Sequence, residues 1–466
     1  MKQADGTVRI VAQNDELATG PERSHWRTTV LCLMIGCATA VQLSPFLDGW
    51  ILTADDALFH YWAMTRPPED WLAIGWSTAL WKAKLGEFLS IPVMVAGNAA
   101  IESVTIRAAN LAVFAMSLGV FALWLGRQFG GGLALAFAIV ALTVTPLRFF
   151  HMPPTSYPFF PSLQVVLLMV CLLGLRARGL LGAVAFGGIV LAMLSSEYTL
   201  LLGSALILFE ASREVRSLQV LVVDKRLWVL GLTGLVHIAF REFGAGNYTE
   251  MSGTLETGRI IQVVVYHTLN GTALGPAGFP FDLGTLSAAD FTSAALAAGA
   301  TGGSVLLAAP YLGKPNARTA PVLALVVLVV IAMTGPIALL EKYRDWCDSP
   351  SHCAYIDSRY AGWAAMIVLA LPLQAALRRI SAIGPAMTIG LLAGLTALQN
   401  ASVAHEMRIH LEPWRVAERS VCGGEGVWAA FVESEVGRSV SFHETDGRTR
   451  ADYWQAWADG TSCPQE

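Results

Sequence analysis

The stretch Leu47–Arg66, LDGWILTADDALFHYWAMTR, directly follows the first long apolar run of the chain, residues 28–46. Two adjacent carboxylates, Asp55 and Asp56, lie at its centre. Aromatic residues flank this pair on both sides, at Trp50, Phe59, Tyr61 and Trp62. An acidic pair among aromatic residues is unusual for a plain connection at the end of a membrane helix, so we expect the rest of the chain to be organised around it.

The composition of the chain is that of a membrane protein. Of its 466 residues, 54% are hydrophobic and only 14% are charged, whereas a soluble protein is about 25% charged. The sequence therefore predicts an all-α protein that crosses the bilayer several times. A net charge of −4 is small for this length and argues against a nucleic-acid partner. Residues 1–27 are polar and lack a signal-peptide pattern, so the first apolar run is expected to remain as a helix.

Apolar runs of the length that a bilayer requires, about 17–25 residues, recur along the chain. We expect about eleven membrane-spanning helices, near residues 28–46, 107–126, 131–147, 160–176, 180–195, 198–211, 227–243, 289–312, 319–340, 360–377 and 383–400. The fifth and sixth of these runs are short and share the junction at Ser195–Glu197.

Lys and Arg in short loops predict the orientation of the protein in the membrane. With the N-terminus in the cytoplasm, every short loop on that side is basic. The long segments 47–106, 244–288 and 341–359 then lie outside, together with the C-terminal tail. Within the first of these segments, aromatic residues between Trp71 and Trp81 predict amphipathic helices on the membrane surface.

This orientation divides the chain into three parts. Residues 1–27 form a cytoplasmic tail, residues 28–400 form the transmembrane domain, and residues 401–466 form an exterior extension.

The cysteines agree with this orientation. Cys347 and Cys353 fall in one predicted exterior loop, and Cys422 and Cys463 bracket the exterior tail. An oxidising exterior favours disulfides, so we expect one within each pair, with four free thiols as the alternative. A zinc site at Cys347, His352 and Cys353 is the weaker interpretation, because no second close pair of Cys or His completes the usual ligand spacing.

Asp55–Asp56 is the first candidate for chemistry. A glycosyl transfer with inversion needs a carboxylate that takes the proton from the acceptor hydroxyl. Adjacent residues point in different directions, so one acid of the pair would be the base. The alternative is a structural role, in which Thr53 or Asp55 caps the helix that continues through Phe59 and Trp62. We prefer Asp56 as the base, because Asp55 is better placed to help the cap.

Basic residues near the predicted exterior helix ends form the second candidate group. A lipid-linked sugar donor carries a phosphate, which Arg and Lys bind and whose departure they ease. The group comprises Lys82, Lys84, Arg107, Arg148, Arg241, Arg259 and Arg359. Arg359 is the first choice, since it precedes Tyr360 at the start of a helix; anchoring at lipid headgroups is the alternative role for each member.

Two further stretches are candidates for the walls of a site. The connector Pro146–Pro161, PLRFFHMPPTSYPFFP, contains His151 and either lines a sugar or lipid groove or forms a stiff loop at the membrane interface. Glu197 lies at the junction of two short helices. A carboxylate at membrane depth is costly and indicates function, whereas a carboxylate in an exterior turn is ordinary.

This order of helices and loops, with Thr53–His60 in the first exterior loop and Ser358–Tyr360 before a late helix, resembles the GT-C superfamily of integral-membrane glycosyltransferases. The architecture is similar to that of protein mannosyltransferases, and the resemblance covers residues 28–400. It implies an enzyme of a bacterial inner membrane. The implied donor is a polyprenyl-phosphate or polyprenyl-diphosphate sugar, and the acceptor is an exterior glycan, lipid or protein.

The resemblance also implies roles for single residues. Asp55 or Asp56 would be the base, and Arg359 would contact the donor or its phosphate. The superfamily has metal-dependent branches, so the use of a divalent metal stays open, although the chain has no clear set of metal ligands.

Two other functions remain as alternatives. An O-antigen polymerase or ligase uses exterior arginines and a late exterior loop, which would make Arg359 essential. A transporter or flippase of lipid-linked sugars would place charged residues along a path through the membrane. The charged residues of this chain gather at one predicted face instead.

Overall fold

The computed structural model of the protein describes residues 21–50, 53–148, 151–214, 224–243, 256–276, 283–312, 319–379, 381–440, 442 and 448–461. These residues form helices and connecting turns, and no strand occurs among them, which confirms the all-helical fold. Each predicted apolar run contains a helix: α1 (Pro21–Leu43), α5 (Val104–Phe129), α6 (Gly131–Val144), α7 (Ser162–Gly174), α8 (Gly179–Leu194), α9 (Glu197–Glu214), α11 (Lys225–Phe243), α13 (Ala288–Leu312), α14 (Thr319–Ala338), α16 (Ile356–Arg379) and α17 (Ile383–His410).

The described residues contain fewer candidate membrane spans than the eleven that the sequence predicts. In the described part of the chain, six segments are long and apolar enough to cross a membrane: Trp26–Leu47, Val104–Phe129, Ala288–Leu312, Thr319–Ala338, Ile356–Leu377 and Ile383–Cys422. Helices α6, α7 and α8 are apolar but have only 14, 13 and 16 residues. The structure therefore supports a helical membrane protein, and eleven spans are not supported.

Proline explains part of this difference. The predicted runs near 131–147 and 160–176 counted apolar residues up to and around Pro146 and Pro161. In the structure α6 ends before Pro146 and α7 begins after Pro161, because proline lacks the amide hydrogen that a helix interior needs.

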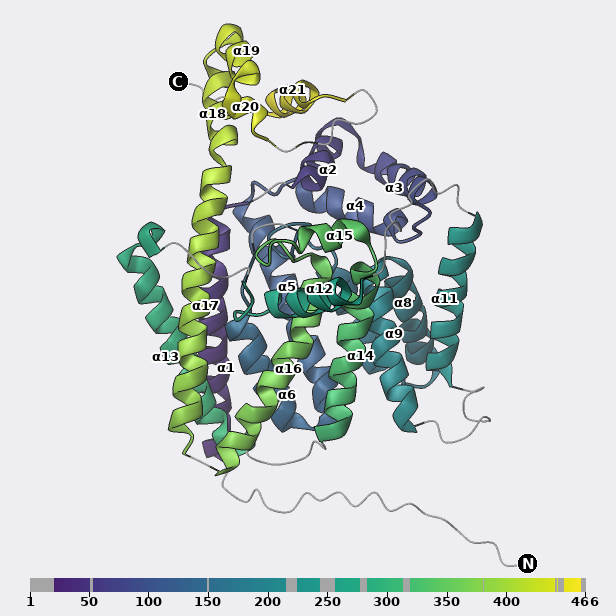
Figure 1. Ribbon diagram of the computed structural model, residues 1–466, viewed down its shortest axis with the longest axis vertical. Coiled ribbons are helices and arrows are strands. Elements are labelled where there is room, and N and C mark those ends of the chain that lie inside the picture. Colours follow the sequence, from purple (N-terminus) through teal and green to yellow (C-terminus); the bar gives the residue numbers. More distant parts are fainter. Residues whose placement is uncertain are drawn as a thin grey trace, which may run out of the picture.

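The predicted exterior segments gather at one end of the helical body, which we call the upper end (Figure 1). α1 begins at the opposite end. The helices at the upper end are α2 (Ala54–Thr65), α3 (Pro68–Lys82), α4 (Glu87–Asn98), α15 (Glu341–Trp346), α18 (Glu412–Cys422), α19 (Glu425–Glu433), α20 (Glu435–Arg438) and α21 (Arg450–Gly460). Helix α12 (Thr257–Asn270) lies below α15, across the middle of the view. The side of the membrane that this end faces stays a prediction.

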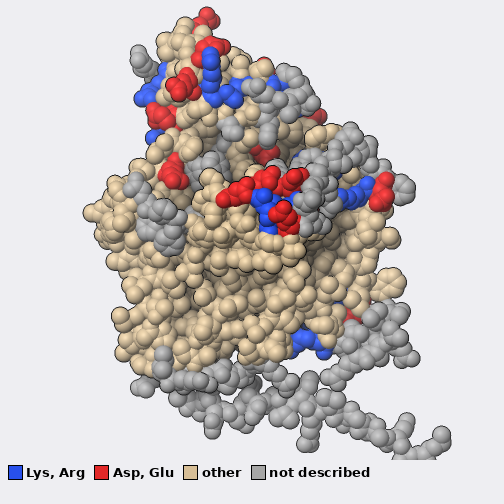
Figure 2. Space-filling view, in the orientation of Figure 1, with Lys and Arg blue, Asp and Glu red and all other residues tan. Residues whose placement is uncertain are grey.

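The outer surface below the upper end is apolar. Figure 2 shows Lys, Arg, Asp and Glu clustered around α15 and on the C-terminal helices, with a broad band below them that carries none on the visible described face. Large apolar side chains are exposed along the long helices, among them Leu123, Leu296, Val327, Ile331 and Leu391. Helix α3 also exposes Leu72, Trp76 and Leu80 at four-residue spacing, which fits its predicted place on the membrane surface.

The C-terminal extension packs onto the Leu47–Arg66 stretch. Helix α17 passes the predicted boundary at residue 400 and ends at His410. Beyond it, an aromatic cluster joins the last helices to Trp50 and Ala57 through Trp414, Phe431, Phe442, Tyr453, Trp454 and Trp457. The hydroxyl of Tyr453 lies 3.1 Å from His60 Nδ1 and accepts a hydrogen bond from Trp414 Nε1 at 3.0 Å. The extension thus holds α2 from above.

Helix α4 packs tightly against the connector between α6 and α7. A Cβ atom at Gly97 would lie 2.7 Å from the carbonyl oxygen of Pro158 and 2.9 Å from its Cβ. Real Cβ atoms do not approach that closely, so only glycine allows this distance between α4 and the connector.

We expect Gly97→Ala to lower the stability of the protein. The added methyl must displace the connector, at a cost of about 1–3 kcal/mol in the free energy of unfolding. The matched control is Gly119→Ala in α5, where a Cβ would meet no atom within 4 Å. Thermal unfolding in detergent, followed by tryptophan fluorescence, should show a lower apparent Tm for Gly97→Ala alone; equal values for the two variants would contradict the close packing.

Candidate functional site

The two acids of the Leu47–Arg66 stretch have different environments. Asp56 is fully buried and closes a capping box with Thr53 at the start of α2. Its Oδ2 accepts hydrogen bonds from the Thr53 hydroxyl at 2.8 Å and the Thr53 amide at 3.3 Å, while its own amide donates to Thr53 Oγ1 at 3.1 Å. Asp56 therefore caps the helix, and the prediction that Asp55 would help the cap is wrong.

Asp56 also joins α2 to two other segments. Its Oδ1 accepts hydrogen bonds from the Tyr157 amide of the connector at 3.1 Å and from Asn98 Nδ2 of α4 at 3.4 Å. Burial raises the pKa of the Asp56 carboxyl to about 7 from its ordinary 3.8, against the opposing effect of the hydrogen bond from Thr53. A side chain without exposed surface is suited to structure rather than to contact with a substrate.

Asp55 is half-buried and takes no part in the capping box of α2. Its Oδ2 accepts a hydrogen bond from the Tyr157 hydroxyl at 3.0 Å. Burial, together with the nearby Tyr355 and carboxylates, raises the pKa of the Tyr157 hydroxyl well above its ordinary 10.0. Tyr157 thus remains a donor to Asp55, and its oxygen lies 2.9 Å from His151 Nδ1. Since the hydroxyl proton points to Asp55, His151 Nδ1 is the donor in that second contact.

Two lysines bring positive charge to the same place. Lys82 Nζ lies 3.0 Å from Glu87 Oε1, and Lys84 Nζ lies 3.7 Å from Glu197 Oε2. Burial opposes the charge of Lys82, but the attraction of Glu87, Asp55 and Glu197 outweighs it and raises the pKa of the lysine. Lys82 therefore keeps its charge within the field of Asp55. Glu197 is exposed at the start of α9, and its depth relative to the membrane stays a prediction.

Aromatic rings form a wall beside these charges. His151 stacks on Trp346 with ring centroids 5.4 Å apart and lies 5.7 Å from Tyr355. Tyr343 lies 5.0 Å from Tyr355, with Tyr343 and Trp346 on α15 and Tyr355 in the loop that follows it. His151 and Tyr157 each have a φ of +54°, a conformation that costs energy outside glycine and that clusters at functional sites.

We call the group formed by Asp55, Lys82, Lys84, Glu197, His151 and Tyr157 the Asp55 site. The first five of these were predicted as site residues from the sequence. The sequence did not distinguish them from the other predicted site residues. It missed Tyr157, Tyr355 and Glu87 as site residues, although Tyr157 stands in the proline-rich connector that the sequence marked as a wall. No motif in the sequence around Tyr355 or Glu87 marks them as site residues. They lie near the site only because the fold brings distant parts of the chain together.

The remaining nominated residues do not face this site. Arg107 donates to the carbonyl oxygens of Leu47, Ile101 and Glu102. Arg148 donates to those of Asn270 and Thr272, and Arg359 to those of Pro146 and Pro153 at 2.8 and 2.9 Å.

Arg359 and Tyr360 are 0% and 1% exposed, and Arg148 is 4% exposed. A guanidinium without exposed surface cannot meet a lipid phosphate in this conformation, so the choice of Arg359 as a donor contact conflicts with the structure. Arg259 pairs with Asp348 instead, and Arg241 is exposed near the end of α11.

The cysteine prediction is confirmed for one pair. Cys347 and Cys353 form a disulfide. Cys422 is disulfide-bonded as well, and its predicted partner Cys463 lies outside the described residues. Among those residues, the group with metal-ligand spacing is His267, Cys347 and Cys353, and it belongs to α12 and the loop after α15 rather than to the Asp55 site.

Comparison of the chain with protein-family models, with curated proteins and with solved structures finds no match.

We expect the stability of the protein to depend on pH through Asp56. The folded protein binds this proton at pH values where the unfolded chain has lost it, because the folded pKa of about 7 exceeds the ordinary 3.8. Its contribution is fully present below the lower value and is lost as pH rises through the higher one. Asp56→Asn should lower the apparent Tm, since an amide group replaces an acceptor, and should flatten its pH dependence between these values. Glu69→Gln, which changes an exposed acid in the first turn of α3, is the control and should keep the slope; a slope that survives in Asp56→Asn would contradict this role.

Proposed function

We propose that the protein is a membrane glycosyltransferase of the GT-C type. It moves a sugar from a polyprenyl-phosphate or polyprenyl-diphosphate donor to an exterior glycan, lipid or protein acceptor in a bacterial inner membrane, with a cytoplasmic N-terminus and an exterior C-terminus. The observation that carries the proposal is a half-buried carboxylate, Asp55, that accepts a hydrogen bond from Tyr157 and whose charge helps to raise the pKa of Lys82, at the upper end of a bundle of apolar helices.

Asp55 is the base in this proposal. Its carboxylate takes the proton of the acceptor hydroxyl while the acceptor oxygen attacks the anomeric carbon. The bond from that carbon to the phosphate oxygen breaks, and the phosphate leaves with the electron pair. The hydrogen bond from Tyr157 orients the carboxylate, and His151 in turn holds the Tyr157 hydroxyl.

Lys82 and Lys84 match the charge of the leaving phosphate. Each now pairs with a carboxylate, Glu87 or Glu197, across 3.0 or 3.7 Å. The Lys84 pair is long and both side chains are partly exposed, so it costs little to exchange Glu197 for a phosphate. The aromatic wall of His151, Tyr355 and Trp346 offers flat apolar faces to a sugar ring or to the first prenyl units.

The alternatives receive less support from the same geometry. A polymerase or ligase that depends on Arg359 needs that guanidinium at a surface, and it is fully buried. A transporter needs charged groups along a path through the membrane, whereas Asp357 and Arg359 of α16 lie in the first turn of that helix, close to the upper end.

We expect Asp55→Asn to abolish sugar transfer while the protein stays folded. Loss of a general base reduces a rate by about 100-fold to 10,000-fold. The assay is glycan and lipid analysis of a deletion strain complemented with each variant. Glu69→Gln, which changes an exposed acid in the first turn of α3, is the matched control and should restore the missing sugar fully. Restoration by Asp55→Asn, with normal protein levels, would refute the assignment of the base.

We expect Lys84→Met to weaken binding of the donor's phosphate. A hydrogen bond to a charged group contributes about 1.5–3 kcal/mol, or roughly 10-fold to 100-fold in affinity. Binding of undecaprenyl phosphate to the purified protein in detergent measures this loss directly. Lys225→Met removes a lysine at the start of α11, away from the contacts of the Asp55 site, and serves as the control. Equal affinity in the two variants would remove Lys84 from the site.

A further inference from the structure

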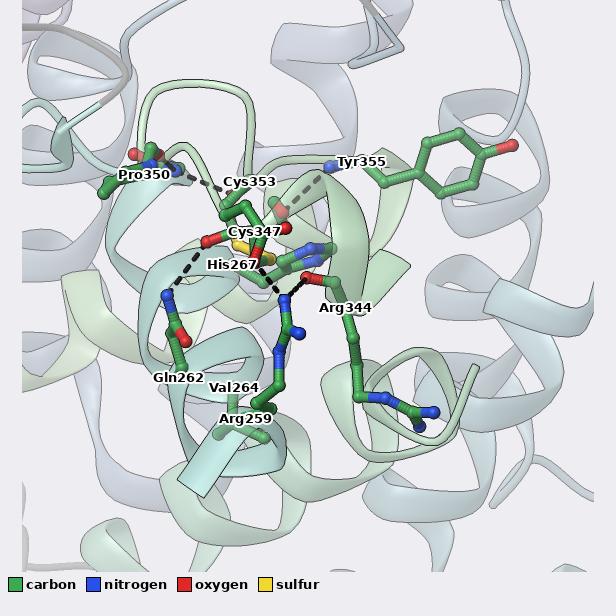
Figure 3. Close-up of a disulfide and its surroundings, with 12 residues drawn as sticks. Arg259, Gln262, Val264, His267, Arg344, Cys347, Pro350, Cys353 and Tyr355 are labelled. Carbon is green, nitrogen blue, oxygen red and sulfur yellow. Dashed lines mark hydrogen bonds and ion pairs between the residues drawn. A yellow bond between two sulfur atoms is a disulfide. The ribbon is translucent and has the colours of Figure 1, made fainter. Parts of the chain in front are cut away.

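A buried histidine–aspartate pair lies beside the Cys347–Cys353 disulfide. His267 comes from α12 and Asp357 from the first turn of α16, and both side chains are 0% exposed. His267 Nδ1 lies 2.8 Å from Asp357 Oδ2. Figure 3 shows the His267 ring next to the two sulfur atoms, and the ligand atoms of His267, Cys347 and Cys353 all lie within 4.8 Å of one another.

This arrangement leaves polar atoms without partners. His267 Nε2 and Asp357 Oδ1 are buried and make no hydrogen bond within the described structure. In the tautomer whose Nδ1–H donates to the carboxylate, Nε2 carries the lone pair of the ring, and the ring lies next to the sulfur atoms (Figure 3). A disulfide has no proton to offer that lone pair. A buried polar atom without a partner destabilises a protein, and a ligand bound at Nε2 would remove part of that cost.

We propose that the reduced form of this site binds a zinc ion through Cys347, Cys353 and His267. A dithiol reductant supplies two electrons and two protons to the S–S bond and becomes a disulfide itself. The metal then binds both sulfur atoms as thiolates and releases their two protons. Nε2 of His267 is the third ligand, water fills the fourth position, and Asp357 fixes the ring from behind, as carboxylates do for zinc-bound histidines.

Binding of zinc at this site requires only small movements of the three ligand atoms. Zn–S bonds of about 2.3 Å and Zn–N bonds of about 2.0 Å place tetrahedral ligand atoms roughly 3.5–3.8 Å apart. The three ligand atoms already fit within 4.8 Å. The two sulfur atoms must separate by rotation of the cysteine side chains, and any ring-to-sulfur distance near the 4.8 Å limit must shorten by about 1 Å.

The backbone around the cysteines is held independently of the disulfide. Gln262 Nε2 donates to the Cys347 carbonyl at 2.9 Å, and Asn270 Nδ2 donates to the Cys353 carbonyl at 2.7 Å. Both side chains belong to α12, the helix that carries His267. Reduction therefore leaves the two cysteines beside the histidine, and the zinc ion replaces the disulfide as the link within this loop.

Close packing fixes α12 against α16 at the same point. A Cβ atom at Gly271 would lie 2.1 Å from the Ser358 carbonyl oxygen and 2.7 Å from Gly362 Cα. This contact keeps His267 and Asp357 in register, because neither helix can move toward or away from the other without loss of packing.

Cobalt substitution tests the proposal with a signal that only thiolate ligands give. A Cys422→Ser/Cys463→Ser background removes the other cysteines expected to be oxidised. Purified in detergent and reduced, this protein should expose two new thiols by thiol titration. It should then bind one Co²⁺ per chain with a thiolate-to-cobalt charge-transfer band, and Zn²⁺ should displace the cobalt. The oxidised protein should give no band.

Matched variants make the assignment specific. Cys347→Ser/Cys353→Ser keeps the free thiols of Cys32, Cys37 and Cys171 and should lose the band. Asp357→Asn should weaken metal affinity by about 10-fold to 100-fold without loss of the band, and His267→Ala should weaken it further. A disulfide that a dithiol cannot open in the folded protein, a reduced protein without the band, or full affinity in His267→Ala would each overturn the proposal. None of these readouts depends on sugar transfer.

Discussion

The buried carboxylate of Asp56 is the constraint on which the upper end of the molecule depends. It accepts hydrogen bonds from Thr53 of the α2 cap, from Asn98 of α4 and from the Tyr157 amide of the connector. Three segments far apart in sequence therefore meet at one side chain. Burial of a carboxylate is costly, and the raised pKa of Asp56 reports that cost. The Asp56 carboxylate fixes the backbone of Tyr157. It thereby also places the Tyr157 hydroxyl, which donates to Asp55.

The adjacent acids differ because of helix geometry. Thr53 is the N-cap, which makes Asp56 the third residue of α2, the position whose side chain turns back to the cap. Asp55 comes one residue earlier and is turned by about 100° around the helix axis, so its side chain leaves the cap and faces Tyr157. The preference for Asp56 as the base overlooked this rule. Once Thr53 is taken as the N-cap, the sequence alone assigns the structural role to Asp56.

Much of the fold follows from local sequence, and much of the site does not. Apolar runs located the long helices, and the Cys347–Cys353 disulfide joins two residues only six positions apart, so it could be predicted from one loop. The long-range partners had no such signal. Arg359 lies 206 and 213 residues from the carbonyl groups that it binds, and His267 lies 90 residues from Asp357. A single sequence shows that an arginine stands near a helix end, but it does not show whether lipid, ligand or backbone receives its hydrogen bonds.

The arginines and the lysines near the upper end make different kinds of contact. Arg107, Arg148 and Arg359 each donate to two or more carbonyl groups. Irregular backbone beside membrane helices has carbonyl oxygens that no helix satisfies, and water is scarce there. A planar guanidinium with several fixed donors can serve two such oxygens at once, which an ammonium does less well. The lysines contact carboxylates at a more accessible place. The arginines therefore stabilise the backbone around the connector. In the proposed function, the lysines are the cations that exchange a carboxylate for the donor's phosphate.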